Sequence, residues 1–291
     1  MTTTLDPAFE FYVRENPGLS YEDPASSWLV RALTRHLETL MGRPKLEGLY
    51  HQLKAQTPDA PCFFKEALKA SQIRVNVDKS PLERIDTSKP LLFIANHPFG
   101  VLDGLVMCNL ALGLSGNFRV VINSLLCQDR ELAEYFLPID FSGTKEAAAR
   151  NIRAKQLAIE ALQNNIPLIL FPSGMVSTAD NFGFGKVYDG PWSTFVAKLA
   201  TKVQPTIVPV YFEGQNSRPF HLASHIAEPL RMAMLLREAL KRFGSEINLT
   251  IGEPMASQDY CNQSKRHELT QRLYEVVQSL APARGSSSRA E

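Results

Sequence analysis

A histidine and an aspartate lie close together in one short segment, Asn96-His97-Pro98-Phe99-Gly100-Val101-Leu102-Asp103-Gly104. A neutral imidazole can take a proton from a hydroxyl group near pH 7 when a carboxylate orients the ring and stabilises the imidazolium. Six helical steps would place the two side chains about 120° apart around the axis, but Pro98 and Gly100 predict a turn before a helix that contains Asp103. His97 is therefore a candidate general base and Asp103 its orienting partner. The alternative is structural, with His97 capping that helix and Asp103 favouring its positive N-terminus.

A second turn follows another apolar run, at Phe171-Pro172-Ser173-Gly174. Glycine allows a backbone to approach a ligand closely. Backbone amides at Gly100, Gly174 or a neighbouring turn are thus candidate donors to the negative oxygen of a tetrahedral intermediate. An ordinary exit from a strand into a loop would have the same composition, so this turn is informative only together with the first.

Short apolar strands that alternate with longer amphipathic stretches must position these two turns. Strands are predicted at residues 73–77, 91–95, 118–122, 167–171, 206–212 and 247–251, and the clearest helix at 145–163. Both turns follow the carboxyl end of a predicted strand, which is where open α/β sheets bind their ligands. The alternation predicts an α/β fold whose central sheet, mostly parallel or mixed, is covered by helices.

The chain divides by composition into three parts. Residues 1–60 have helical spacing, for example between Trp28 and Leu40, and are predicted to form an N-terminal helical extension. Residues 61–282 are predicted to form the α/β domain. The small and polar residues 283–291 predict a disordered tail.

Charge and composition exclude several classes of protein. The 291 residues carry a formal net charge of +1, which provides no general field for wrapping nucleic acid. The four cysteines are widely separated and predict reduced thiols in the cytoplasm. No apolar run approaches the roughly 18 to 20 residues that span a bilayer. His221 and His225 have the spacing of two zinc ligands, but the glutamate of that motif and a third ligand are missing, so we expect no metal.

In this order, the two turns resemble the motifs of the glycerolipid (lysophospholipid) acyltransferase family, which has an Asn-His-x4-Asp block and a downstream Phe-Pro-Glu-Gly block. Asn96, His97 and Asp103 match the first block, and residues 171–174 match the second. A third family block, an apolar-Pro-apolar step, is similar to residues 207–210. The additional residue between His97 and Asp103 resembles a bacterial subgroup with Asn-His-Pro-x-Gly-x-x-Asp-Gly, which includes haemolysin-like and lyso-ornithine-lipid acyltransferases. The resemblance covers roughly residues 70–255.

This resemblance implies transfer of a fatty acyl chain from acyl-CoA or acyl-carrier protein to the hydroxyl of a lysophospholipid, glycerol phosphate or similar lipid acceptor, with no bound cofactor. His97 would act as the base, with Asp103 orienting it. The residues that it implies in substrate binding are Asn96, Phe99, Gly100, Phe171, Pro172, Ser173 and Gly174.

Two departures from the family pattern concern the acceptor. Ser173 stands where the family has a glutamate that is associated with placing the acceptor, so the identity of the acceptor does not carry over. The arginine block of the family is not cleanly present. Arg150 and Arg153 are the candidates for binding a phosphate or carboxylate, because guanidinium groups pair bidentately with oxyanions, although they also fit a solvated helix face.

An enzyme with a lipid substrate must reach a bilayer surface. We expect a cytoplasmic protein that is peripheral on the inner membrane, with acyl-carrier protein as a possible partner. Residues 230–243 and the helices around Trp28 are candidate membrane contacts, and packing onto the sheet is the alternative for the former. Two alternative functions are a lipid hydrolase or thioesterase and a non-catalytic acyl-lipid-binding protein. The oligomeric state, chain length, donor and head group stay open.

Overall fold

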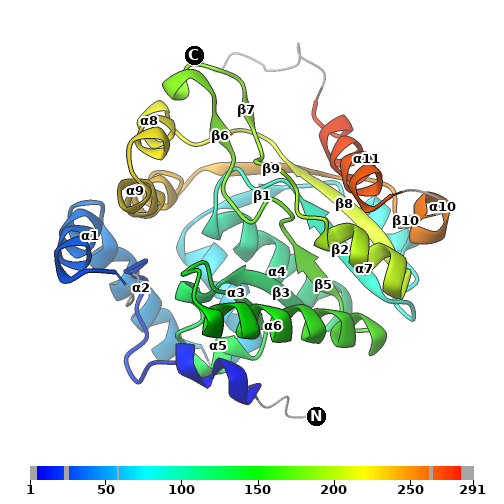
Figure 1. Cartoon of the computed structure of the whole chain (residues 1–291), viewed down its shortest axis with the longest axis horizontal. Helices are drawn as coiled ribbons and strands as arrows, with labels where there is room; N and C mark the ends of the chain where they lie inside the picture. Colours follow the sequence, from blue (N-terminus) through cyan, green and yellow to red (C-terminus); the bar gives the residue numbers. More distant parts are fainter. Residues whose placement is uncertain (1–4, 23–25, 58, 262–264, 283–291) are drawn as a thin grey trace.

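A computed structural model describes residues 5–22, 26–57, 59–261 and 265–282, and the predicted tail 283–291 lies outside these described residues. Within them, an eight-stranded sheet forms the centre of the molecule (Figure 1). Seven strands follow one another in the spatial order β1-β9-β8-β2-β5-β3-β4, and β10 pairs with β8. The strands are β1 Arg74–Asn76, β2 Leu91–Ala95, β3 Arg119–Asn123, β4 Phe136–Ile139, β5 Leu168–Leu170, β8 Thr206–Phe212, β9 Glu246–Ile251 and β10 Met255–Ala256.

Most neighbouring strands in this sheet are parallel. The pairs β1–β9, β2–β5, β2–β8, β3–β5 and β3–β4 are parallel, whereas β8–β9 and β8–β10 are antiparallel. Helices cover both faces, as parallel strands that are apolar on both sides require. The predicted fold class, α/β with a mostly parallel or mixed sheet covered by helices, is therefore confirmed.

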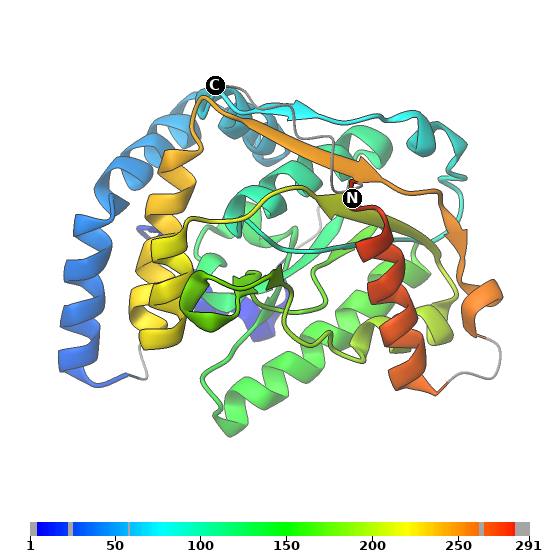
Figure 2. The same ribbon diagram turned by 90° about the horizontal axis from the view of Figure 1, so that it is seen from above.

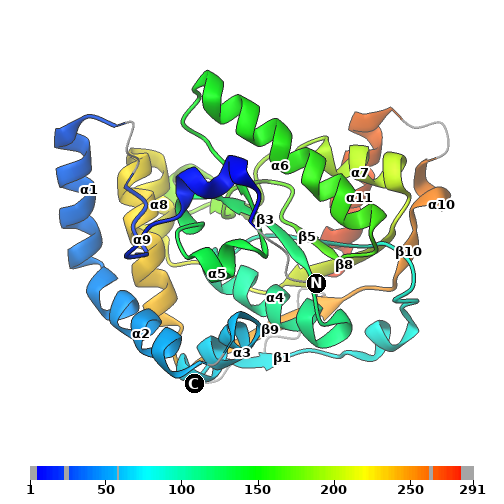
Figure 3. The ribbon, with the colours of Figure 1, turned by 90° about the horizontal axis from the view of Figure 1, so that it is seen from below.

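The two faces of the sheet bury separate hydrophobic clusters, and β2 contributes to both. Leu91 and Phe93 point into the cluster beneath α3 (Ala60–Ala70) and α4 (Val101–Ser115). The alternate residues Leu92 and Ile94 point into the other cluster, since successive side chains of a strand face opposite sides. That second cluster is covered by α6 (Lys145–Gln163), α7 (Phe195–Val203) and α11 (Arg266–Ser279), and α6 crosses its face in Figure 3.

A separate group of helices lies at one end of the sheet. It comprises α1 (Trp28–Leu40), α2 (Arg43–Gln56), α8 (Arg218–Ile226) and α9 (Glu228–Lys241), and Figure 2 shows α1 alongside α9. The predicted boundary at residue 60 coincides with the start of α3. Tyr50 of α2 and Phe64 of α3 belong to one hydrophobic cluster, and the domain boundary stays a prediction.

Two elements of the core, β4 and α3, contain a proline and are absent from the predicted strands and helices. Pro138 is tolerated in β4 because this strand lies at the edge of the sheet. Pro61 is tolerated in α3 because it occupies the first turn, where the N–H has no partner in any case. The other described elements are η1 Pro7–Tyr12, η2 Ser80–Arg84, η3 Ser124–Leu126, α5 Arg130–Ala133, β6 Thr178–Ala179, η4 Asn181–Gly183, β7 Val187–Tyr188 and α10 Ser257–Cys261.

No helix in the described ranges combines the length and the apolar character that crossing a bilayer requires. Cys62, Cys108 and Cys127 all have free thiols, and the latter two are buried.

Candidate active site

Three neighbouring parallel strands direct the candidate residues to one edge of the sheet. β2 lies between β8 and β5, and both pairings are parallel, so the carboxyl ends of all three strands meet. His97 follows the end of β2, and Phe171 follows the end of β5. Their rings stack with a centroid separation of 4.2 Å and an interplanar angle of 29°. The structure thus brings together the two turns that the sequence separates by more than seventy residues.

His97 and Asp103 contact each other directly. Nδ1 of His97 lies 3.1 Å from Oδ2 of Asp103, and the Asp103 side chain is fully buried while that of His97 is 18% exposed. The same Oδ2 accepts a hydrogen bond of 2.7 Å from the backbone N–H of Phe99. Burial raises the pKa of the Asp103 carboxyl above its ordinary value, and the contact with His97 opposes this rise. A buried carboxylate on Nδ1 leaves Nε2 for a substrate.

Gly100 makes this contact possible. Its backbone has φ 69° and ψ −124°, which side-chain-bearing residues rarely adopt, and it caps the N-terminus of α4. The N–H of Asp103 donates to the carbonyl of Gly100 at 3.0 Å, so Asp103 lies in the first helical turn. The chain reverses at Gly100, and the carboxylate consequently points back toward His97.

A second buried carboxylate holds the His97 segment from the opposite direction. Asp189 is 4% exposed, and its Oδ1 accepts hydrogen bonds from the His97 N–H at 3.1 Å and from the Ser177 hydroxyl. Its Oδ2 accepts a hydrogen bond of 3.0 Å from Nε1 of Trp192. Burial raises the pKa of this carboxyl as well. Sequence reasoning missed Asp189, because no spacing rule connects it with a residue more than ninety positions away.

The turn after β5 packs against the His97 segment through its backbone. Gly174 has a positive φ of 65°, and its N–H donates to the Phe171 carbonyl at 2.9 Å, so this amide is already engaged. Ser173 donates through Oγ to the Met175 carbonyl at 2.8 Å. The N–H of Ser177 donates to the His97 carbonyl at 2.8 Å, which ties the two turns together.

Three other predicted residues occupy positions that support the backbone. The amide group of Asn96 exchanges two hydrogen bonds with the backbone of Phe212, at 2.9 and 2.7 Å, and so joins the ends of β2 and β8. Phe99 is buried beneath the guanidinium of Arg242, whose Cζ lies 3.6 Å from the ring centroid. Pro172 accepts a hydrogen bond of 2.8 Å from the Ser193 N–H through its carbonyl.

Arg150 and Arg153 are not brought to His97. Arg150 donates to the Tyr12 hydroxyl at 2.7 Å and to Asp140 at 3.1 Å. Arg153 forms an ion pair of 2.8 Å with Asp6. Both arginines instead fasten the segment before α1 to α6.

An apolar cavity of about 420 Å³ extends from His97 toward the N-terminal helices. Its wall along α4 includes Gly100, Val101, Gly104, Leu105 and Cys108, which lie on one helix face. At 1.5 Å per residue, this stretch of α4 is about 12 Å long. The opposite wall includes side chains of α2, α3 and α9, among them Leu46, Leu49, Leu53, Phe63, Phe64, Arg231, Met232 and Leu235.

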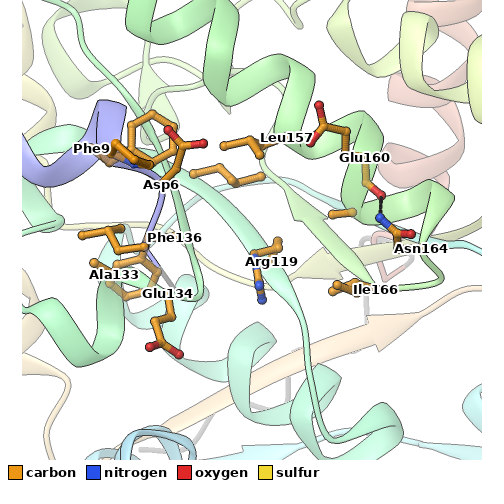
Figure 4. Close-up of a pocket in the computed structure, with 14 residues that line it drawn as sticks. Asp6, Phe9, Arg119, Ala133, Glu134, Phe136, Leu157, Glu160, Asn164 and Ile166 are labelled. Atoms are coloured by element: carbon orange, nitrogen blue, oxygen red, sulfur yellow. Dashed lines mark hydrogen bonds between the residues drawn. The ribbon is translucent and has the colours of Figure 1, made fainter. Parts of the chain in front are cut away.

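A second cavity, of about 320 Å³, lies elsewhere in the molecule (Figure 4). Asp6, Phe9, Arg119 and Leu157 are among the residues that line it, and His97 is not. The guanidinium of Arg119 donates a hydrogen bond of 2.8 Å to the carbonyl of the preceding residue, Phe118. This cavity contributes no group to the His97 site.

The described residues include no cluster of three metal-ligating side chains. His221 and His225, which have the spacing of zinc ligands, contact one backbone segment instead. The N–H of Ala179 donates to Nδ1 of His221 at 3.2 Å, and its carbonyl lies 2.8 Å from Nε2 of His225. Both imidazoles therefore hold β6 against α8.

Comparison with known proteins identifies the family of this chain. Residues 57–272 match the family described as "Acyltransferase". The chain is 30% identical over 213 residues to the lyso-glycine lipid O-acyltransferase of Phocaeicola vulgatus, a match that covers 70% of this chain and 73% of the relative. It is 25% identical to the enzyme of the same name from Bacteroides thetaiotaomicron, over 70% and 75% of the two chains.

Among solved structures, the 1-acyl-sn-glycerophosphate acyltransferase PlsC from Thermotoga maritima is similar over 86% of each chain, with 20% identity and a TM-score of 0.48. The family match extends from α3 to α11 and includes all three sequence motifs. The predicted resemblance is confirmed: this protein is an enzyme that belongs to the acyltransferase family.

Proposed function

We propose that this enzyme transfers an acyl chain from an acyl thioester to the hydroxyl of a lysolipid, with His97 as the general base. The observation that carries the proposal is the 3.1 Å contact between His97 Nδ1 and the buried Asp103 carboxylate at the mouth of an apolar cavity. Asp103 holds the imidazole tautomer that leaves Nε2 unprotonated and stabilises the imidazolium after proton transfer.

The reaction proceeds without a covalent acyl-enzyme. Nε2 of His97 takes the proton of the acceptor hydroxyl while the oxygen attacks the thioester carbonyl. The tetrahedral intermediate then collapses, its C–S bond breaks, and the imidazolium returns the proton to the leaving thiolate. An ester and a free thiol result, so protons and electrons balance without a cofactor. The donor thiol is that of CoA or of acyl-carrier protein.

The apolar cavity supports a long acyl chain as the transferred group. Its lining along α4, α2 and α3 is almost entirely hydrophobic. Burying methylene groups in such a cavity is favourable by about 0.8 kcal/mol for each group. A short or polar acyl group would leave this energy unused, and we therefore propose fatty acyl thioesters as donors.

The acceptor is a single-chain lipid with a free hydroxyl. The two relatives named as lyso-glycine lipid O-acyltransferases support an acceptor with a glycine head group and a product with an ester bond. A lysophospholipid is the second candidate, in line with the family resemblance.

The enzyme works at a bilayer surface, and α1 supports this part of the proposal. Its buried residues are polar, Thr34 and Glu38, whereas Trp28 is 73% and Leu40 67% exposed. A helix whose apolar face points away from the protein fits the interface of a membrane. We propose peripheral attachment to the cytoplasmic face of the inner membrane through this helix.

The decisive experiment measures thiol release from acyl-CoA and from acyl-carrier protein with a panel of lyso-glycine lipids and lysophospholipids. We expect release that depends on an acceptor and that falls at least about 10²-fold in His97→Ala, with the variant folded as judged by circular dichroism. Release that is equally fast without any acceptor would identify a thioesterase instead. Undiminished release by His97→Ala would disprove the general-base role.

A further inference from the structure

Arg231 of α9 lines the same cavity as His97. Among the described residues that line this cavity, it is the only lysine or arginine. Its Nη2 donates to the Val176 carbonyl at 2.8 Å, and its Nη1 lies 3.9 Å from Sδ of Met175. Its buried Nε has no hydrogen-bond partner in the described part of the chain. Most of the donor capacity of this guanidinium is therefore unused.

No carboxylate of the described residues forms an ion pair with Arg231. Glu228 also lines the cavity one helical turn earlier; its charge partly opposes the lowering of the Arg231 pKa, but it is exposed and forms no ion pair with the guanidinium. Arg150 and Arg153, by contrast, are paired with Asp140 and Asp6. Burial lowers the pKa of Arg231, which reflects the cost of placing a cation there. A buried charge is favourable only when an opposite charge pairs with it.

Arg231 is joined to His97 through a short backbone route. It contacts the carbonyl of Val176, and the next residue, Ser177, donates through its N–H to the carbonyl of His97 at 2.8 Å. Gly100 lies close to the same place, since a Cβ built on it would be 3.3 Å from Val176 and 3.5 Å from Leu235 of α9. Two hydrogen bonds through residues 176–177 therefore link the guanidinium to the backbone of the base, and both side chains line the same cavity.

We propose that Arg231 binds the anionic head group of the lipid acceptor and thereby places the acceptor hydroxyl against His97. The planar N–H donors of a guanidinium pair bidentately with the oxygens of a carboxylate or phosphate, which is the chemistry that this head group must offer. This assignment rests on the proposed acyl transfer. It further predicts that the enzyme selects an acceptor with a charged head group. Arg150 and Arg153 are committed to other contacts and are not available for this role.

The test compares acceptors that differ only in the charge of the head group. An N-acylglycine lysolipid with a free carboxylate is paired with its methyl ester, and a lysophosphatidate is paired with the corresponding monoacylglycerol. The wild-type enzyme should prefer the charged member of one pair, which identifies the oxyanion as carboxylate or phosphate. In Arg231→Gln this preference in kcat/KM should fall by about 10- to 100-fold, with the KM for the donor unchanged. Arg231→Lys should retain part of the preference.

Arg237→Gln is the matched control, because Arg237 lies exposed on the same helix and is not part of the cavity wall. It should leave the preference intact. Equal losses for the charged and the neutral acceptor in Arg231→Gln would show that Arg231 only anchors Val176, and would overturn the proposal. A higher KM for the thioester with unchanged acceptor preference would assign the guanidinium to the donor and overturn it equally.

A binding measurement separates this proposal from the proposed reaction. His97→Ala protein and the His97→Ala, Arg231→Gln double variant are titrated with the carboxylate lipid and its methyl ester, and with the phosphate pair. Tighter binding of a charged lipid that depends on Arg231 would support the assignment even if the wild-type enzyme transferred no acyl group. Equal affinity for the charged and neutral members of both pairs would overturn it.

Discussion

His97 lies between two buried carboxylates that act on different parts of the residue. Asp103 contacts the ring at Nδ1, whereas Asp189 accepts the hydrogen bond of the backbone N–H. The stacked ring of Phe171 restricts the remaining motion of the imidazole. We infer that Asp103 orients the imidazole and that Asp189 is a positioning residue for the backbone of His97.

Replacing Asp103 by Asn should separate catalysis from stability. The variant loses the charge that supports the imidazolium, and we expect kcat to fall by about 10² to 10⁴-fold. Its fold should become more stable at neutral pH, because it no longer buries an ionised carboxylate. Activity and the free energy of unfolding, measured between pH 4 and pH 8, check both parts.

The pH dependence of that stability difference has a definite sign. Burial raises the pKa of Asp103 above its ordinary value of 3.8, so the folded protein binds this proton more strongly than the unfolded chain does. The contribution of Asp103 to stability therefore falls as the pH rises from 3.8 through the folded pKa. The gain of Asp103→Asn should be absent below that window and should appear as the pH rises above it. A variant less stable than wild type at pH 8 would contradict this account.

The helix α4 carries Asp103 in its first turn and also forms a wall of the cavity. Gly104 lies on its cavity face, one turn after Gly100, and a Cβ built on it would meet no atom within 4 Å. The empty space beside Gly104 is therefore continuous with the cavity. Gly113 has equally free space near the other end of α4, but it is exposed and outside the cavity wall.

We expect Gly104→Leu to shorten the acyl chain that the enzyme accepts. The Cβ of the new side chain enters free space in the cavity wall. The leucine should take up volume next to His97, so kcat/KM for long-chain thioesters should fall at least about tenfold relative to short-chain ones. Thiol release from a series of donors of increasing chain length provides the measurement.

Gly113→Leu on the same helix is the control and should leave the preference for chain length unchanged. Both substitutions remove a helix-interior glycine and should stabilise α4 by roughly 0.5–1 kcal/mol, so lost activity would not reflect unfolding. An unchanged chain-length profile in Gly104→Leu would show that the acyl chain does not pass along this helix.

At the scale of the whole molecule, α1 is attached to the body by its polar side. Glu38, fully buried, accepts hydrogen bonds from Ser20 and from the N–H of Tyr21, and forms an ion pair with Arg43 at 3.1 Å. The exposed face carries Trp28, Leu29, Val30, Leu33 and Leu40. Because α1 lies next to α9, which carries Arg231, this face would place the entrance for the head group near the lipid surface.

The double substitution Trp28→Glu, Leu33→Glu should weaken binding to anionic phospholipid vesicles by roughly tenfold or more, because each apolar side chain contributes about 1.5–3 kcal/mol when it leaves water. Cosedimentation with vesicles measures this effect. Activity on an acceptor embedded in vesicles should fall with it, while activity on a short, monomeric acceptor should persist.

Ile152→Glu is a suitable control, since Ile152 is a similarly exposed apolar residue on α6. It should bind vesicles as the wild type does. If the α1 variant cosedimented as well as the wild type, the membrane contact would have to lie elsewhere on the molecule.

The sequence alone determined the fold class, the pairing of His97 with Asp103 and the family. These depend on local patterns. One is the set of apolar runs of strand length, and the other is the turn at Gly100 that places Asp103 next to His97. The sequence alone did not give β4 and α3, which contain Pro138 and Pro61, because only the position of an element in the fold shows whether a missing N–H is tolerated.

Tertiary structure alone decided which other charges belong to the site. Arg150 and Arg153 were the arginines that the sequence favoured, but ion pairs with residues far away in the chain hold them elsewhere. Asp189 contacts the backbone of His97 from about 90 residues further along the chain, and Arg231 contacts Val176 from 55 residues further along. No periodicity reports such contacts, because the packing of parallel strands and of α9 creates them and no spacing along the sequence encodes them.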